Sequence, residues 1–182
     1  MKQLDAVNII LPALGEHPVT ELDDKHPTLA ILLPIMEMKR RELLGKGWWF
    51  NSVKYTMYPG IDDKIAVPAN CLEFITDNGA FVQGKYLYNP DTGNVIFTEA
   101  VTGNMINDVP FESLPESIAS VILYSSLVQA YLTDVGLEQI VQQWAQQAQQ
   151  SLETATSMHL RYMRHSTTKS ARYRRYRNSL RG

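Results

Sequence analysis

The sequence predicts an α+β protein in which a four-helix body carries a β-rich insert between its second and third helices. Apolar residues recur at helical spacing toward both ends of the chain, whereas apolar and polar residues alternate between turn signals in the middle. The length of 182 residues fits one domain with an insertion better than two independent enzymatic domains. We therefore expect residues 1–47 and 114–165 to form the helical body, residues 48–113 the insert, and residues 166–182 a basic C-terminal arm.

Two helices are expected in the N-terminal quarter. Residues 3–14 have apolar side chains at helical spacing, and Gly15 stands where a left-handed residue ends a helix. A second helix is expected over residues 27–44, with a kink or a one-turn break at Pro34, because proline lacks the N–H group that a helix interior needs. A Gly-Lys-Gly sequence then ends this helix.

The pattern changes to that of a sheet at Trp48, from which apolar and polar residues alternate as far as Met57. Residues 89–93, Asn-Pro-Asp-Thr-Gly, predict a tight hairpin, since proline and glycine occupy the positions that such a turn favours. Further short strands, bounded by turn signals, are expected over residues 71–76, 80–82, 85–88 and 95–98.

The chain is expected to return to helix after Ser113, which has capping-box spacing to Glu116. A mostly buried helix is expected over residues 115–135, and a fourth helix of about 40 Å over residues 137–163. Seven glutamines between positions 139 and 150 give the fourth helix a polar, uncharged face. We interpret this face as solvated in preference to a subunit interface, although interface cores also exclude charges.

The charge is divided unevenly along the chain. Residues 1–153 have a net charge of −10, whereas residues 154–182 have a net charge of +8. A basic tail of this kind is typical of a segment that binds an acidic protein or a nucleic acid. The candidate partner-binding residues are cations interleaved with tyrosines: Arg161, Arg164, Lys169, Arg172, Tyr173, Arg174, Arg175, Tyr176, Arg177 and Arg181.

No catalytic, cofactor-binding or metal-binding residues are predicted. The sequence has neither a GxxxxGK[ST] nor a GxGxxG motif, and its four histidines lack the HExxH spacing of a zinc site. The single cysteine, Cys71, lies in an apolar run and is expected to be a buried hydrophobic residue of a protein from a reducing cytoplasm. Apolar runs are too short to span a bilayer, so we expect no membrane partner. The sequence therefore argues against an enzyme.

Three consecutive aromatic residues, Trp48, Trp49 and Phe50, stand where the helical pattern gives way to the sheet pattern. We expect them to fill the junction between bundle and sheet, in preference to forming a stacking platform for nucleic-acid bases. Strand alternation places at least one of the two tryptophans on the outer side, where it is a candidate contact to another subunit.

Two segments of the chain resemble a known family. The first is AVNIIL at residues 6–11, followed by GEHPV at residues 15–19 and by Leu22. The second is KGWWFN at residues 46–51, a basic residue followed by Gly-Trp-x-Phe-Asn at the exit of the second helix. In this order, with a β-rich insert and two closing helices behind them, they resemble tail tubular protein A, the head-to-tail adaptor family of short-tailed phages. The resemblance covers about the first third of the chain.

The resemblance implies a structural virion protein of the phage tail, assembled in the host cytoplasm. It implies a homo-oligomeric ring of twelve copies between the portal protein and the tail nozzle protein, with tail fibres attached nearby. Genome DNA would pass through the ring without sequence-specific binding. For the isolated protein, a disordered and solvated arm remains open. In an assembly, we expect the arm to bind an acidic surface of the portal in preference to DNA phosphates.

Two other functions remain open at the level of the sequence. A basic-tailed nucleic-acid-binding protein is favoured by the arm and by the clustered aromatic residues, and is opposed by the acidic body. A small enzyme of an unrecognised class is the weaker of the two, because the motif search finds nothing to support it.

Overall fold

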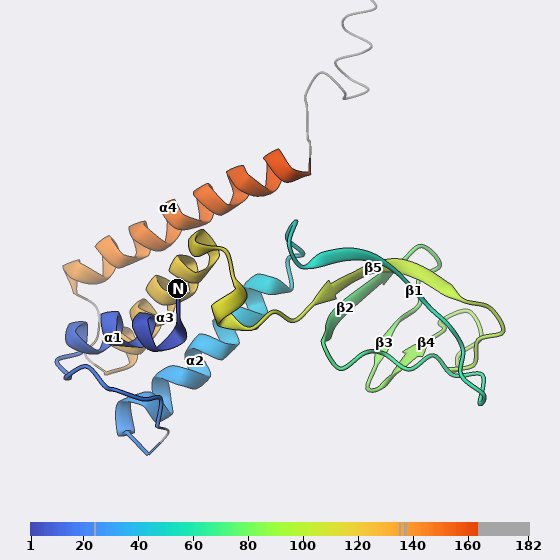
Figure 1. The fold of residues 1–182 in the computed structure, drawn as a ribbon, viewed down its shortest axis with the longest axis horizontal. Coiled ribbons are helices and arrows are strands. Elements are labelled where there is room, and N and C mark those ends of the chain that lie inside the picture. Colours follow the sequence, from blue (N-terminus) through green and yellow to red (C-terminus); the bar gives the residue numbers. More distant parts are fainter. Residues whose placement is uncertain (24, 135, 137, 164–182) are drawn as a thin grey trace, which may run out of the picture.

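The computed structural model describes residues 1–23, 25–134, 136 and 138–163, and confirms a mixed fold of helices and antiparallel strands (Figure 1). Its helices are α1 (Gln3–Ala13), α2 (Pro27–Leu44), the short 3-10 helix η1 (Phe111–Ser113), α3 (Glu116–Asp134) and α4 (Gln139–Tyr162). Its strands are β1 (Ser52–Met57), β2 (Cys71–Thr76), β3 (Phe81–Gln83), β4 (Tyr86–Tyr88) and β5 (Val101–Asn107).

Helix α3 lies in the middle of the helical part (Figure 1). Helix α4 packs along one side of α3, α2 packs on the other side, and α1 contacts a further part of α3. Ile118 and Ile122 of α3 are fully buried, as a helix surrounded by others requires. We call the hydrophobic cluster of these helices the helical core; its largest fully buried side chains are Ile10, Leu11, Leu29, Leu32, Met36, Leu44, Ile118, Ile122, Leu123 and Leu127.

The strands form a three-stranded antiparallel sheet in the order β1-β5-β2 and a separate hairpin of β3 and β4. Strand β5 is central because it pairs with β1 through Val53↔Met105 and with β2 through Phe74↔Met105. These strands and the adjoining loops bury a second cluster, which we call the β core: Met57, Ile65, Phe74, Ala80, Leu87, Phe97, Val101 and Met105.

The predicted strand over residues 95–98 is wrong, and the central strand β5 was not predicted at all. Ile96 forms only an isolated bridge with Lys64, and Phe97 donates its N–H to the carbonyl of Asp63 while its ring enters the β core. Phe97 thus packs in the β core, whereas Ile96 is 41% exposed, and the segment forms no regular strand pairing. Gly103 interrupts the alternation of β5, yet it is required there: a Cβ atom would lie 2.5 Å from the carbonyl oxygen of Ile75.

Helix α2 runs through Pro34 without a one-turn break, which excludes one of the two alternatives expected there. Two smaller expectations are wrong. Strand pairing begins at Ser52, not at Trp48, because a turn separates α2 from β1. The capping box does not form: Ser113 belongs to η1, and Glu116 Oε2 accepts a hydrogen bond of 3.0 Å from the N-terminal amino group of Met1.

Replacing residues 52–106 with a short glycine-serine linker is expected to leave the helical core folded. The Asn107 N–H donates to the carbonyl of Asn51 at 2.8 Å, so the two ends of the insert already meet. The helical core takes no fully buried side chain from these residues. Helical circular dichroism and cooperative thermal unfolding measure the outcome, and complete unfolding would contradict it.

A matched control removes only residues 52–98. That variant keeps β5 without its two partner strands and exposes the apolar side chains of Val101, Met105 and Ile106. We expect this shorter deletion to aggregate, while the longer replacement stays monodisperse in gel filtration.

Candidate functional site

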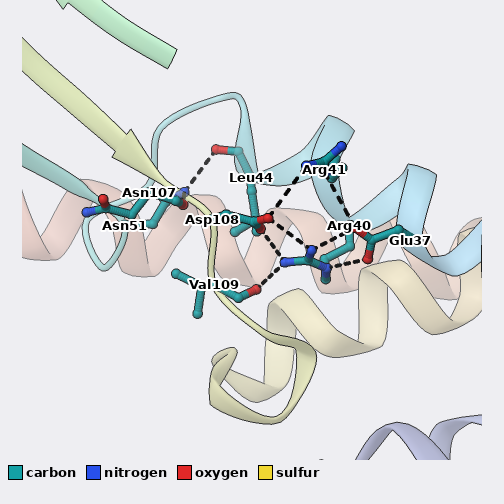
Figure 2. Close-up of polar contacts among 8 residues, drawn as sticks. All are labelled: Glu37, Arg40, Arg41, Leu44, Asn51, Asn107, Asp108 and Val109. Carbon is teal, nitrogen blue, oxygen red and sulfur yellow. Dashed lines mark hydrogen bonds and ion pairs between the residues drawn. The ribbon is translucent and has the colours of Figure 1, made fainter. Parts of the chain in front are cut away.

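The helical part meets the sheet at a junction built around Asn51, whose side chain is 1% exposed. Its Oδ1 accepts a hydrogen bond of 2.7 Å from the Trp48 N–H, and its Nδ2 donates to the carbonyls of Leu44 and Asn107, each at 3.0 Å. One amide thereby joins the end of α2, the turn before β1 and the end of β5 (Figure 2). Because a buried amide without partners is costly, these bonds select one geometry for the junction.

Gly47 makes this close meeting possible. It adopts a φ of +70°, the left-handed conformation that ends a helix, and so confirms the predicted helix end. A Cβ atom at this position would lie 3.1 Å from Cδ1 of Ile106, which is buried in β5. Any larger residue would therefore be strained and would also press on the sheet.

A second set of contacts at the junction centres on Arg40 of α2 (Figure 2). Its guanidinium donates to both carboxylate oxygens of Glu37, at 2.8 Å each, and to Asp108 and the Val109 carbonyl. The pKa of Arg40 is raised, mainly because its side chain is hydrogen-bonded to Glu37, so the guanidinium group stays positively charged. Arg40 thus ties the segment after β5 to α2.

The third part of the junction is an aromatic cluster formed by Trp48, Trp49, Phe50, His159 and Tyr162. The Trp48 ring is 6% exposed, and its Nε1 donates to the Leu43 carbonyl at 2.7 Å. The Trp49 ring is half-buried and stacks on Tyr162 of α4, with centroids 5.3 Å apart and planes 5° apart. His159 lies edge-on to Trp48 at 5.7 Å. The last two turns of α4 are therefore held against the junction.

The structure separates the sequence-predicted binding residues into two groups. Trp48, Trp49 and Phe50 lie between α2 and β1, and Arg161 is exposed in the last turn of α4. The remaining candidates lie outside the described residues: Arg164, Lys169, Arg172, Tyr173, Arg174, Arg175, Tyr176, Arg177 and Arg181.

The roles of several junction residues were not predicted from the sequence. Asn51 was part of the KGWWFN segment, but no local pattern indicated that its amide is buried. Asp108 and His159 meet their partners from distant parts of the chain, at separations of 68 residues from Arg40 and more than 100 from Trp48. Only a tertiary fold reveals such pairs.

The described part of the chain contains no group of three or more His, Cys, Asp or Glu side chains that could hold a metal ion. Burial raises the pKa of the half-buried Cys71 thiol, which is the opposite of what a nucleophile needs. A hydrogen bond to Glu138 raises the pKa of Tyr131.

No helix within the described residues is long and apolar enough to cross a membrane.

Comparison with known proteins assigns the chain to a protein family. The family model for tail tubular proteins matches residues 4–165, which is most of the chain. This chain belongs to the tail tubular protein family. Tail tubular protein A of Klebsiella phage KP34 is 33% identical over 182 residues, which cover 98% of each chain. The finding confirms the resemblance seen in the first third of the sequence and extends it to nearly the whole chain. Members of this family are structural components of the phage tail, and the family is not one of enzymes.

Substituting Asn51 with alanine is expected to destabilise the protein by about 2–4 kcal/mol, because three backbone groups at the junction lose their buried partner. Chemical denaturation measures the change. The matched control is Asn70→Ala, which removes an exposed amide whose bond to Asn107 is 3.3 Å long. A change below about 0.5 kcal/mol at both positions would refute the proposed importance of the Asn51 amide.

Truncating the two tryptophans is expected to have different effects. Trp48→Ala removes a buried ring and is expected to lower the free energy of unfolding by about 3–5 kcal/mol. Trp49→Ala removes the half-buried ring that stacks on Tyr162, so it is expected to act mainly by loosening the end of α4. Denaturation measures the first effect, and hydrogen exchange of residues 156–162 measures the second.

The control for the tryptophan variants is Tyr58→Ala, since this ring is 73% exposed. A double-mutant cycle of Trp49→Ala with Tyr162→Ala is expected to give a coupling of about 0.5–1.5 kcal/mol. Equal and small effects of Trp48→Ala and Trp49→Ala would show that the aromatic cluster is not a structural junction.

Proposed function

We propose that this chain is a subunit of the head-to-tail adaptor, a ring that joins the portal protein to the tail nozzle protein and lines the path of the exiting DNA. The observation that carries the proposal is the family match along almost the whole chain, together with the relative named tail tubular protein A. The ring has twelve copies in this proposal, and tail fibres attach close to its junction with the nozzle.

The fold suits a connecting role. An adaptor needs different surfaces for its neighbours in the ring and for the partners above and below it, and it needs no active site. The helical core and the β core supply two bodies with separate hydrophobic interiors. In the proposal, the helical part forms the ring and the β part, whose strand β1 has one edge free of strand pairing among the described residues, faces the nozzle or the fibres.

The basic arm is proposed to dock the ring onto an acidic surface of the portal. Residues 166–182 carry five arginines and one lysine and no acidic residue. Arginine binds carboxylates through two parallel hydrogen bonds, which favours a specific acidic surface over a role in solubility. The arm follows α4, whose last turns are held at the junction by Tyr162 and His159.

Binding of the arm to DNA is the competing use. A channel that must release its genome gains nothing from strong binding to phosphates, and the net charge of −10 over residues 1–153 repels DNA from the rest of the subunit. For this reason we assign the arm to the portal.

Cryo-electron microscopy of the assembled phage tests the adaptor role directly. The density of this chain is expected between portal and nozzle, as a ring of twelve subunits around the DNA path. Density for the chain at any other place in the tail would refute the adaptor role.

Removing residues 166–182 is expected to leave the fold intact and to abolish binding to the purified portal. Binding by the full chain is expected to weaken as the salt concentration rises, because exposed charges are screened. A matched variant replaces the six cations of the arm with glutamine and keeps its length, and a second replaces its arginines with lysine. Undiminished binding by the truncated chain would contradict the proposal. If the full chain binds DNA in a salt-sensitive way and the truncated chain does not, the arm is instead a nucleic-acid-binding segment.

A further inference from the structure

Helix α2 carries an exposed apolar stripe, which we call the α2 ridge: Ile31, Pro34 and Met38. Ile31 is 58% exposed and Met38 is 47% exposed, although both are large aliphatic side chains. The three positions follow the i, i+3, i+7 spacing of one helix face. That face is opposite to the one formed by Leu29, Leu32 and Met36, which lies in the helical core. The ridge therefore points away from the subunit.

A groove with apolar walls lies on the same subunit. It lies between α3 and α4, is bordered by Lys39 of α2, and has a volume of about 550 Å³. Val121, Val128 and Leu132 of α3 line one wall, and Ala145, Ala148 and Leu152 of α4 line the other. Leu132 is 42% exposed, so the groove opens to solvent. We call it the α3–α4 groove.

The ridge and the groove correspond in length and in charge. Residues 31–38 extend about 10 Å along α2, and residues 145–152 extend the same distance along α4. Residues 27–36 and 140–152 contain no charged residue, although 20% of the whole chain is charged. Depletion of charge is the compositional mark of an interface core, whereas a merely solvated helix gains nothing from it. The glutamine-rich α4 is therefore better explained as part of an interface than as a solvated face.

Charged residues of α2 lie beside both surfaces. Glu42, which is exposed, follows the ridge by one turn, and Lys39 stands at the border of the groove. Within one subunit these two side chains form an exposed pair at 3.4 Å. Such a pair contributes little to stability, so its members are free to exchange partners at small cost.

We propose that the α2 ridge of one subunit packs into the α3–α4 groove of the next copy of the same chain. The contact joins two different surfaces, so it is heterologous and can continue from copy to copy until a ring closes. Helices α2 and α4 both pack on α3, so the ridge and the groove are separate surfaces of one subunit, with Lys39 between them (Figure 1). The inference rests on the proposed ring and names the residues that build it.

Two charged variants test the contact at high protein concentration by analytical ultracentrifugation. The ridge variant is Ile31→Glu with Met38→Glu, and the groove variant is Leu132→Glu with Ala145→Glu. All four positions are exposed in the subunit, so the fold is expected to survive. Each variant is expected to weaken self-association at least about tenfold relative to the native chain.

Mixing the two variants gives the decisive result. The ridge variant keeps a native groove and the groove variant keeps a native ridge, so an equimolar mixture retains one functional contact and is expected to form a dimer and nothing larger. The control variant, Ile61→Glu with Ile75→Glu, alters exposed apolar residues of the insert and is expected to associate like the native chain. Circular dichroism and thermal unfolding check the fold, and the milder pairs Ile31→Ser with Met38→Ser and Leu132→Ser with Ala145→Ser replace any charged variant that unfolds.

Three outcomes would overturn the inference: a native chain that stays monomeric at its highest soluble concentration, variants that associate like the native chain, or a mixture that forms no dimer. Each of them leaves the adaptor role standing if microscopy of the phage places the chain between portal and nozzle. If microscopy places the chain elsewhere, the adaptor role fails, and the dimer experiment still reports on the ridge and the groove.

Discussion

The architecture depends on a single buried amide. The Asn51 side chain joins the nearby backbone groups of Leu44 and Trp48 to Asn107, which is 56 residues away, and these hydrogen bonds are internal to the junction. Without it, the carbonyls of Leu44 and Asn107 and the N–H of Trp48 would lose a partner in a place that water does not reach freely. The two hydrophobic cores are thus connected through polar backbone groups that are all hydrogen-bonded to the Asn51 side chain.

The other contacts at the junction act on different segments and reinforce the same geometry. Arg40 holds the chain that leaves β5 against α2, and the stacked rings of Trp49 and Tyr162 hold the end of α4. The chain therefore uses one small region to hold the insert, α2 and the end of α4 in place. In the proposed adaptor role, this region keeps the surfaces for different partners in fixed positions relative to one another.

The sequence predicted the elements whose patterns are long and local. The four helices were found within a few residues of their bounds because their apolar stripes repeat over several turns, and Gly15 and Gly47 marked two of their ends. The central strand β5 was missed because its identity depends on neighbours in space, which require Gly103 in the middle of the strand. The contacts of the junction were not predicted for the same reason, because the roles of Asn51 and His159 arise only where distant segments of the chain meet.

The position of β5 in the chain also determines when the sheet can form during synthesis. Strand β1 has no strand partner among the described residues other than β5, which begins 44 residues after the end of β1. The helical core likewise waits for α3, against which α1 and α2 pack. Both cores are therefore completed late, because the ribosome must release more than half of the chain before β5 is complete and about three quarters before α3 is complete. Until then β1 presents two open edges to other nascent chains, so translation rate and chaperone binding bear directly on the yield of this protein.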